Sequence, residues 1–343
     1  MRVLLTGAAG FIGSRVDAAL RAAGHEVVAV DVLLPAAHGP NSVLPTGCHR
    51  VDVRDADALA PLLDGVDLVC HQAAMVGAGV DAADAPAYGG HNDFATTVLL
   101  AQMFAAGVRR LVLASSMVVY GQGRFECPEH GQVEPLARTR ADLDAGVFEH
   151  RCPIGAEQVA WRLVDEDAPL RPRSLYAASK VAQEHYALAW AESTGGSVAA
   201  LRYHNVYGAL MPRDTPYSGV AAIFRSELEA GDVPRVFEDG GQMRDFVHVD
   251  DVAAANVAAV DAGLDGFSAF NVCSGRPISI LELATELCDA RGDVPPLVTG
   301  QYRSGDVRHI VADPARAAQR LGFRAAVDPR DGLREFAYAP LRG

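Results

Sequence analysis

The segment of residues 1–31 limits the fold of this chain more than any other. Residues 2–5 form an apolar run of strand length, and the glycine-rich turn TGAAGFIG (residues 6–13) follows directly. Residues 11–23 then carry apolar side chains at helical spacing, and residues 26–30 form a second apolar run. A strand, a glycine turn, a helix and a second strand make up the unit from which dinucleotide-binding folds are built.

The glycines of this turn have separate expected roles. Gly7 permits the tight turn, Gly10 lets backbone approach a pyrophosphate, and Gly13 lets the helix pack against the sheet. The pyrophosphate would lie at the helix N-terminus, among unpaired N–H groups. Asp31 follows the second strand, where a carboxylate accepts hydrogen bonds from a ribose 2′-hydroxyl and repels a 2′-phosphate, so the sequence predicts NAD rather than NADP. The plainer alternative is a glycine turn in a sheet protein that binds no ligand.

Strands and helices continue to alternate along the chain. The pattern predicts helices at residues 55–63 and 92–106 and strands at residues 68–71 and 111–115. This alternation predicts an α/β fold, a Rossmann-type doubly wound parallel sheet covered by helices on both faces. Ligands of such sheets bind at the carboxyl ends of the strands.

Small and acidic residues stand at two of these strand ends. Asp52 and Val53 follow the expected third strand, where a side chain can reach the adenine edge. Ala73 and Ala74 follow the fourth strand, where small side chains leave room for a cofactor. Either pair alone would be ordinary loop sequence, but in this context both are candidate cofactor contacts.

Tyr176 and Lys180 are the strongest catalytic candidates. Their spacing of four places both side chains on one face of a helix. A phenol, whose pKa is normally near 10, is a poor base at neutral pH, and a fixed ammonium beside it favours the phenolate. The alternative is a surface helix that carries a Tyr/Lys pair.

Ser115 and Ser116 end the expected fifth strand of the sheet. A hydroxyl at that position can bond to a substrate oxygen as its proton leaves, although a simple strand-end turn is the alternative. No histidine and acid are placed by the sequence as triad partners, so neither serine is interpreted as a nucleophile.

Composition excludes several classes of function. A chain of 343 residues is expected to form two lobes, and its net charge of −13 argues against a nucleic-acid partner. Six cysteines in a chain of this length do not indicate a disulfide framework, which favours a reducing, cytoplasmic setting. No apolar stretch approaches the length of a membrane span, so no membrane association is expected.

Several further motifs complete a pattern that can be compared with known families. The matching positions are residues 6–13, Asp31, Asp52 and Val53, residues 71–74, Asn92, residues 115–116 with 119–121, residues 176–180, 202–208, 244–251 and 303–306. In this order and spacing they resemble the extended short-chain dehydrogenase/reductase family, in its nucleotide-sugar epimerase/dehydratase branch. The resemblance runs from Met1 to about Gly322, nearly the whole chain.

The resemblance implies roles for individual residues. Tyr176 would move the proton, Lys180 would lower the pKa of its phenol, and Ser116 would bond to the reacting hydroxyl. The implied cofactor contacts are Gly7, Gly10, Phe11, Ile12, Gly13, Asp31, Asp52, Val53, Ala73, Ala74, Asn92, Ser115, Tyr176 and Lys180. The implied contacts to a nucleoside-diphosphate sugar are Ser116, Asn205, Phe237, Arg244, Arg303 and Asp306.

Two departures from the family pattern narrow the expected reaction. The family's 4,6-dehydratases carry an Asp-Glu pair after the catalytic Ser or Thr, and its 3,5-epimerases carry a cysteine at the second of these positions. Met117 and Val118 stand here, and neither side chain can move a proton. The sequence therefore predicts an NAD-dependent 4-epimerase of a UDP- or dTDP-hexose. The alternatives are a dehydratase or dehydrogenase/reductase of the same family, and a catalytically silent NAD-binding scaffold.

Residues 121–172 form a long insert between a strand and the Tyr176 helix. Cys127 and His130, with Cys152 and Gly155, stand at the x2 spacing of a zinc knuckle, and the resemblance implies a Cys-x2-Cys here in related deoxyhexose 4-epimerases. Gly155 occupies the fourth ligand position. Because three ligands make a poor closed site, we expect a degenerate knuckle and no metal.

The resemblance also divides the chain. It implies an NAD-binding domain at residues 1–202, to which 236–266 returns, and a nucleotide-sugar lobe at 203–235 and 267–343. A proline-punctuated loop at residues 211–217 would cover the sugar. Two helices, 92–106 and 176–193, would pair with their two-fold mates in a homodimer. The apolar contacts expected there come from Leu99, Leu100, Met103, Val181, Tyr186 and Leu188.

Overall fold

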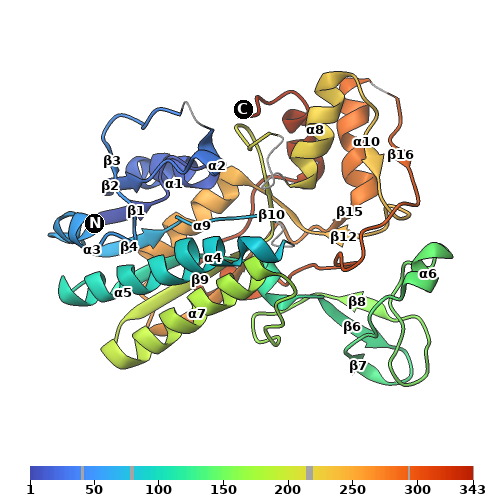
Figure 1. The fold of residues 1–343 in the computed structure, drawn as a ribbon, viewed down its shortest axis with the longest axis horizontal. Coiled ribbons are helices and arrows are strands. Elements are labelled where there is room, and N and C mark those ends of the chain that lie inside the picture. The colour runs from blue at the N-terminus through green and yellow to red at the C-terminus, as the bar shows by residue number, and fades with distance from the viewer. Residues whose placement is uncertain (40–41, 78–80, 214–218, 293, 343) are drawn as a thin grey trace.

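The computed structural model describes residues 1–39, 42–77, 81–213, 219–292 and 294–342 (Figure 1). Its centre is a seven-stranded sheet of order β14-β9-β5-β4-β1-β2-β3, in which all neighbouring strands are parallel. The strands of this sheet are β1 (Arg2–Thr6), β2 (Glu26–Asp31), β3 (Cys48–Arg50), β4 (Leu68–His71), β5 (Arg110–Ser116), β9 (Ser197–Tyr203) and β14 (Gly266–Val272). The predicted Rossmann-type parallel sheet is confirmed.

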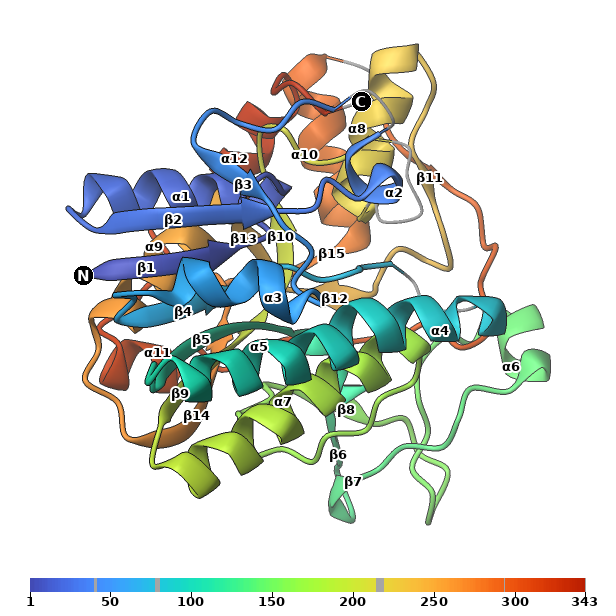
Figure 2. The ribbon, with the colours of Figure 1, turned by 60° about the vertical axis from the view of Figure 1, so that its left-hand side comes forward.

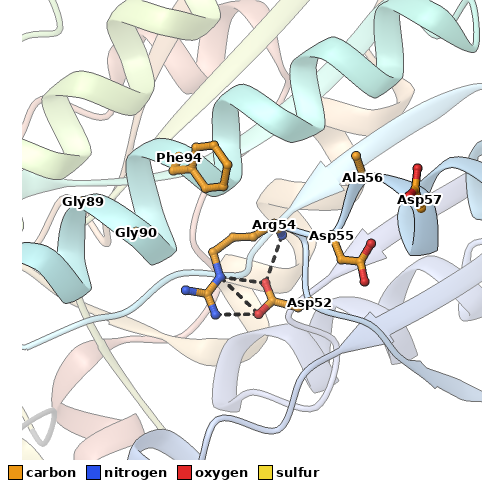
Figure 3. Close-up of a pocket in the computed structure, with 8 residues that line it drawn as sticks. All are labelled: Asp52, Arg54, Asp55, Ala56, Asp57, Gly89, Gly90 and Phe94. Atoms are coloured by element: carbon orange, nitrogen blue, oxygen red, sulfur yellow. Dashed lines mark hydrogen bonds and ion pairs between the residues drawn. The ribbon is translucent and has the colours of Figure 1, made fainter.

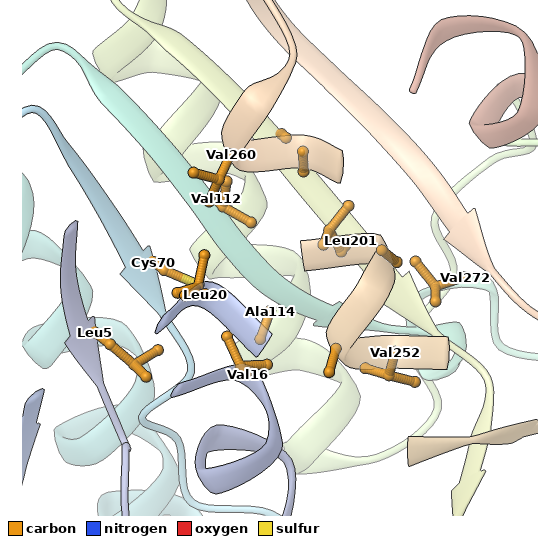
Figure 4. Close-up of a cluster of buried hydrophobic side chains, with 14 of the residues drawn as sticks. Leu5, Val16, Leu20, Cys70, Val112, Ala114, Leu201, Val252, Val260 and Val272 are labelled. Atoms are coloured by element: carbon orange, nitrogen blue, oxygen red, sulfur yellow. The ribbon is translucent and has the colours of Figure 1, made fainter. Parts of the chain in front are cut away.

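Alternating side chains of the strands supply two separate cores. Val3, Leu5 and Cys70 point to the face that is covered by α1 (Phe11–Ala22) and α9 (Val249–Asp261), as Figure 4 shows for part of this cluster. Leu4, Val69, Leu111 and Leu113 point to the opposite face, where α5 (Ala95–Ala105) and α7 (Leu175–Thr194) lie side by side (Figure 2). Each fully buried aliphatic side chain contributes roughly 1.5–3 kcal/mol, so the period-two pattern fixes the register of every strand.

The smaller lobe has its own core. It is built from α8 (Val220–Ala230), α10 (Ile280–Arg291) and α12 (Pro329–Phe336). A capping box starts α10: the Ser279 hydroxyl accepts from the Glu282 N–H, and the Glu282 carboxylate accepts from the Ser279 N–H. Three short strand pairs connect this lobe: β10 (Asn205–Tyr207) with β13 (Phe246–His248), β11 (Arg235–Val236) with β16 (Leu297–Val298), and β12 (Met243–Arg244) with β15 (Ile278–Ser279).

The long insert forms a third unit. Its three-stranded antiparallel sheet contains β6 (Arg124–Cys127), β7 (Gly131–Val133) and β8 (Ala160–Arg162), and α6 (Arg140–Asp144) follows β7. This unit projects away from the main sheet in Figure 1. The other helical elements are short: α2 (Pro35–His38), α3 (Ala56–Leu59), η1 (Ala60–Leu63), η2 (Ala82–Asp84), α4 (Ala85–Tyr88), η3 (Gly89–Phe94), η4 (Met117–Tyr120) and α11 (Ala315–Arg320).

The predicted division of the chain needs two corrections. The sequence places residues 267–272 in the smaller lobe, but β14 pairs with β9 at the edge of the main sheet, because its alternating apolar residues Phe270 and Val272 complete that core. The sequence also predicts that residues 236–248 return to the main sheet, whereas β11, β12 and β13 pair outside it and α9 makes the return.

Two further sequence expectations concern a loop and the membrane. Of the predicted sugar-covering loop at 211–217, positions 214–217 lie outside the described residues. Among the residues that are described, no helix combines the length and the apolar character needed to cross a membrane.

Candidate active site

The glycine turn has the close contacts that its sequence predicts. Gly7 has a φ of +68°, and a Cβ there would lie 2.6 Å from the backbone nitrogen of Ala73. A Cβ on Gly13 would lie 1.9 Å from the carbonyl oxygen of Gly7. A side chain at Gly7 would press on the loop after β4, and one at Gly13 would press on the turn between β1 and α1, so both glycines are required for this close packing.

Asp31 stands at the end of β2 and faces this turn. Its carboxylate accepts hydrogen bonds from the N–H groups of Ala9 (3.0 Å) and Leu33 (2.8 Å). Two cationic or ionisable neighbours that the sequence analysis did not single out also approach it. His38 Nε2 lies 3.5 Å from Asp31 Oδ1, and Arg342 donates to the carbonyl of Ala9. Arg342 comes from the far end of the chain, so sequence spacing gave no signal for it.

An enclosed cavity of about 540 Å³ opens at the carboxyl ends of β1, β2, β4 and β5. This is the side of a doubly wound sheet where its topology places ligands. Most of the predicted cofactor contacts line it, and so do Asn205 and the neighbours Met117 and Val118. The predicted residues that line the cavity are Gly7, Gly10, Phe11, Ile12, Gly13, Asp31, Asp52, Val53, Ala73, Ala74, Ser115, Ser116, Tyr176 and Asn205.

Asp52 also borders a second, open hollow beside the first (Figure 3). Its carboxylate turns toward the guanidinium of Arg54, with 2.6 Å between Arg54 Nη2 and Asp52 Oδ2. This hydrogen-bonded pair holds the pKa of Asp52 below its usual range. Among the described residues that line this hollow there is none of the catalytic candidates, so the first cavity is the candidate active site.

Tyr176 and Ser116 meet in this cavity. Tyr176 lies in the first turn of α7, where the Ser174 hydroxyl caps the helix by accepting from the Ala177 N–H (3.1 Å). Ser116 ends β5. Burial raises the pKa of Tyr176 to about 12, a side-chain hydrogen bond with Ser116 acts to lower it, and Tyr88 raises it further.

Lys180 follows Tyr176 by four residues on α7, and it is not part of the cavity lining. Its ammonium donates to the carbonyl of Ala114 (2.9 Å), and its side chain is buried. Burial lowers the pKa of Lys180 to about 8, while Glu184 and Asp93 act to raise it. The predicted pairing on one helix face is present. In the protein by itself, however, burial dominates the pKa of Tyr176.

Two predicted cofactor contacts have their polar groups turned to other partners. The Ser115 hydroxyl donates to the buried carboxylate of Glu184. Asn92 does not line the cavity: its side-chain oxygen accepts from the Met75 N–H (2.7 Å), and its amide donates to the Ser179 hydroxyl (2.8 Å). Asn92 therefore joins the loop after β4 to α7. The sequence analysis missed Glu184, although its position four residues after Lys180 is the signal that could have found it.

Four predicted substrate residues lie outside the enclosed cavity, in the smaller lobe. The guanidinium of Arg303 lies over the ring of Phe237, 5.2 Å from its centroid. Arg244 donates to the carbonyls of Met243 (2.8 Å) and Arg308 (2.9 Å). Burial lowers the pKa of Arg244 to about 10, and the nearby carboxylate of Asp306 acts to raise it. The structure thus brings Arg244 near Asp306 and stacks Arg303 on Phe237, but it does not place these four against Tyr176.

These features define the class of protein. The family model described as the NAD dependent epimerase/dehydratase family matches residues 3–141 and 153–273. The chain therefore belongs to this family, as the sequence motifs predicted, and the predicted NAD dependence is confirmed with it. The match is interrupted at 142–152, inside the long insert.

Two of the relatives are named 4-epimerases. A dTDP-L-rhamnose 4-epimerase of Burkholderia thailandensis is 34% identical, covering 98% of this chain and 93% of the relative. A UDP-glucose 4-epimerase of Mycolicibacterium smegmatis is 32% identical, with 97% and 96% covered.

Solved structures of epimerases share the whole fold. The UDP-glucose 4-epimerase of Thermotoga maritima with UDP-glucose has a TM-score of 0.79 at 27% identity, covering 98% of this chain and 97% of the other. The UDP-glucose 4-epimerase of Thermus thermophilus in complex with NAD has a TM-score of 0.76 at 31% identity, covering 98% of both chains.

Proposed function

We propose that this protein is an NAD-dependent 4-epimerase of a UDP- or dTDP-hexose. The observation that carries the proposal is that Ser116 and Tyr176 share the NAD-side cavity with Met117 and Val118. The two residues after Ser116 lack any group that moves a proton. Proton transfer would therefore involve only the sugar oxygen that Tyr176 and Ser116 both reach. Of the reactions in this family, this leaves oxidation and reduction at a single carbon.

The residues of the cavity fit NAD. Side chains at Gly7 and Gly13 would fill the turn that is to approach the pyrophosphate, and Asp31 offers acceptors to a ribose. When bound, NAD supplies the hydride acceptor and donor at the sugar C4. Tyr176 takes the proton of the C4 hydroxyl as the ketone forms, and Ser116 bonds to the same oxygen. Tyr176 then returns this proton when the opposite face of the ketone is reduced, so one stereocentre inverts without net oxidation.

Because the pKa of Tyr176 is raised, the bound cofactor would also have to help ionise its phenol. A phenol with a pKa of about 12 is seldom ionised at neutral pH. A positive charge beside the phenol of Tyr176 would favour the phenolate, and oxidised NAD would supply such a charge when bound. Lys180, held at the carbonyl of Ala114, would add a second positive charge on the same helix in its protonated state.

The smaller lobe supplies the contacts for the nucleotide. In this proposal Phe237 and Arg303 receive the base, Arg244 and Asn205 face the diphosphate, and Asp306 reaches the ribose. A planar guanidinium donates two parallel hydrogen bonds to phosphate oxygens. Strong contacts at the diphosphate and few at the hexose would let the 4-keto sugar turn over between the oxidation that forms it and the reduction that follows.

The test is incubation with a panel of dTDP- and UDP-hexoses, followed by mass spectrometry and NMR of the sugar. dTDP-L-rhamnose comes first, because a relative named for it is 34% identical. The expected product has an unchanged mass and an inverted C4. Loss of water would indicate a dehydratase, net oxidation or reduction a dehydrogenase, and unchanged sugar with tight NAD binding a silent scaffold.

We also propose a cytoplasmic homodimer. Its six cysteines, all within the described residues, form no disulfide, which suits a reducing compartment. The expected contact residues need a correction, because Leu99, Leu100 and Met103 are buried in the protein's own core. Exposed apolar side chains on the contacting elements η3, α5 and α7 are available instead, and these are Phe94, Phe104, Tyr186 and Leu188.

A further inference from the structure

The insert holds a cluster of metal-ligating side chains far from the sugar chemistry. Cys127 ends β6, and His130 lies in the turn before β7. Cys152 and Glu157 lie on a neighbouring hairpin, which is closed by a hydrogen bond from the Cys152 N–H to the Glu157 carbonyl (2.7 Å). One ligand atom from each of the four side chains lies within 4.8 Å of all the others.

We propose that Cys127, His130, Cys152 and Glu157 bind one Zn²⁺ ion as a structural site. His130 Nδ1 lies 3.3 Å from Cys127 Sγ and 3.4 Å from Cys152 Sγ. Tetrahedral zinc, with Zn–S bonds of about 2.3 Å and Zn–N bonds of about 2.0–2.1 Å, separates such ligand atoms by about 3.5 Å. The expectation of no metal rested on three ligands, and the fold supplies a fourth.

Glu157 escaped the sequence pattern because it lies two residues beyond the expected position. The chain turns at Gly155 and Ala156, and Ala156 adopts a left-handed φ of 65°. A Cβ on Gly155 would lie 2.1 Å from a carboxylate oxygen of Glu157. The glycine at the expected ligand position therefore makes room for the carboxylate to turn back, and Glu157 Oε2 comes within 3.9 Å of Cys127 Sγ.

Backbone N–H groups face both sulfur atoms, which would bind zinc as thiolates. The N–H groups of Glu129 and His130 donate to Cys127, and those of Ile154 and Gly155 donate to Cys152. These residues follow each cysteine by two and three positions, so the two turns repeat one arrangement.

The insert also needs an additional source of stability. The hydrophobic cluster around the two cysteines has four buried members among the described residues, namely Phe125, Cys127, Cys152 and Val159. Units this small usually depend on a metal or a disulfide. The insert supports the smaller lobe, since Glu149 binds Arg308 (2.6 Å) and His309 (2.8 Å). A metal here would thus stabilise the segment that carries Arg303 and Asp306.

The test is elemental analysis of the full-length protein, purified without chelators or metal-affinity resin. We expect one zinc per chain, and tetrahedral thiolate absorption after exchange with Co²⁺. Cys152→Ser should lose nearly all bound zinc, whereas Cys48→Ser, a control away from the insert, should retain it. Glu157→Gln should weaken zinc binding at least tenfold in a chelator competition.

Three results would overturn the proposal. The first is that wild-type protein holds no zinc after zinc has been added and the excess has been removed from solution. In that case the thiols of Cys127 and Cys152 would also react freely. The second is a Cys127–Cys152 disulfide, seen in a peptide map under non-reducing conditions. The third is equal zinc affinity in Glu157→Gln and wild type, which would exclude the carboxylate. If Cys152→Ser fails to fold, Glu157→Gln and Co²⁺ spectra of the wild type still decide the outcome.

Discussion

The hydroxyl of Ser115 donates a hydrogen bond to the carboxylate of Glu184, and this contact ties the catalytic helix to the central strand. The same carboxylate pairs with Arg202 on β9, at 3.0 Å from Nε and 2.7 Å from Nη2. One buried acid thus fixes α7 against both β5 and β9. Because Ser116 follows Ser115 and Tyr176 lies two turns before Glu184, we infer that this network sets the distance between the hydroxyl oxygens of Ser116 and Tyr176.

Glu184→Gln should therefore reduce both stability and turnover. The guanidinium of Arg202 would be left buried without a counter-charge, which typically costs about 3–5 kcal/mol. Loss of this anion should also lower the pKa of Lys180 further below about 8, because Glu184 acts to raise it. We expect a lower Tm, a fall in kcat larger than any rise in KM, and an alkaline limb of the rate profile that moves to lower pH.

The matched control is Glu192→Gln, at an exposed position of the same helix. It should leave Tm and the pH profile unchanged. A Glu184→Gln protein that is less stable but keeps the wild-type kcat and pH profile, measured well below its Tm, would show that Glu184 has no positioning role.

Tyr176→Phe should abolish epimerisation and leave NAD binding nearly intact. The substitution removes the only atom of this side chain that carries a proton to the C4 oxygen, and general acid–base groups typically contribute 10²–10⁴-fold. Turnover by NMR and NAD affinity by calorimetry measure the two effects. Tyr186→Phe, at an exposed position of the same helix, is the control. Near wild-type turnover by Tyr176→Phe, or solvent deuterium at C4, would contradict the mechanism.

Local patterns in the sequence were sufficient to predict the sheet and most of the residues that line the cavity at its carboxyl edge. The glycine turn and Asp31 depend on contacts between adjacent elements, and their spacing reflects those contacts directly. Residues brought in from distant segments could not be found in this way. Arg342 reaches the glycine turn from the other end of the chain, and Glu157 becomes a ligand candidate only through a left-handed turn.

Burial decides two properties that a sequence pattern does not show: which surface an apolar helix face contacts, and how far the pKa of a side chain shifts. Leu99, Leu100 and Met103 have the apolar spacing of a contact helix, but a periodic pattern does not say whether its partner is the same chain or another one. Tyr176 and Lys180 share a helix face as predicted. Their pKa values, however, are dominated by desolvation, which depends on everything that packs around them.

Leu188→Glu should convert the proposed dimer into a monomer. Leu188 and Tyr186 are exposed on α7, and a carboxylate buried without a partner in an apolar interface costs several kcal/mol. Light scattering at micromolar concentration gives the mass. Ile223→Glu, which places the same charge at an exposed position on α8, should remain dimeric. A monomeric wild type would refute the assembly, and a dimeric Leu188→Glu protein would exclude this face.

Acidification below pH 6.5 should destabilise the protein through buried neutral histidines. His71 accepts from or donates to the hydroxyls of Thr6 (2.7 Å) and Thr96 (3.3 Å), and burial lowers its pKa to about 3, with Lys180 adding to the shift. Between pH 6.5 and about 3, the unfolded chain binds a proton at this imidazole that the folded chain does not. The free energy of unfolding therefore falls by about 1.4 kcal/mol per pH unit from this group.

Other buried groups also change the slope of the free energy of unfolding against pH. Some of them add to the loss of stability in acid, and others oppose it. His150, whose pKa burial lowers to about 4, adds to the loss. Asp93 and Asp245, whose pKa values burial raises to about 6, retain protons in the folded state and offset part of it below pH 6. Urea unfolding between pH 7 and 5 measures the net slope. His71→Gln should flatten it by about one proton, whereas His185→Gln, at an exposed position on α7, should not, and equal slopes in all three proteins would contradict the assignment.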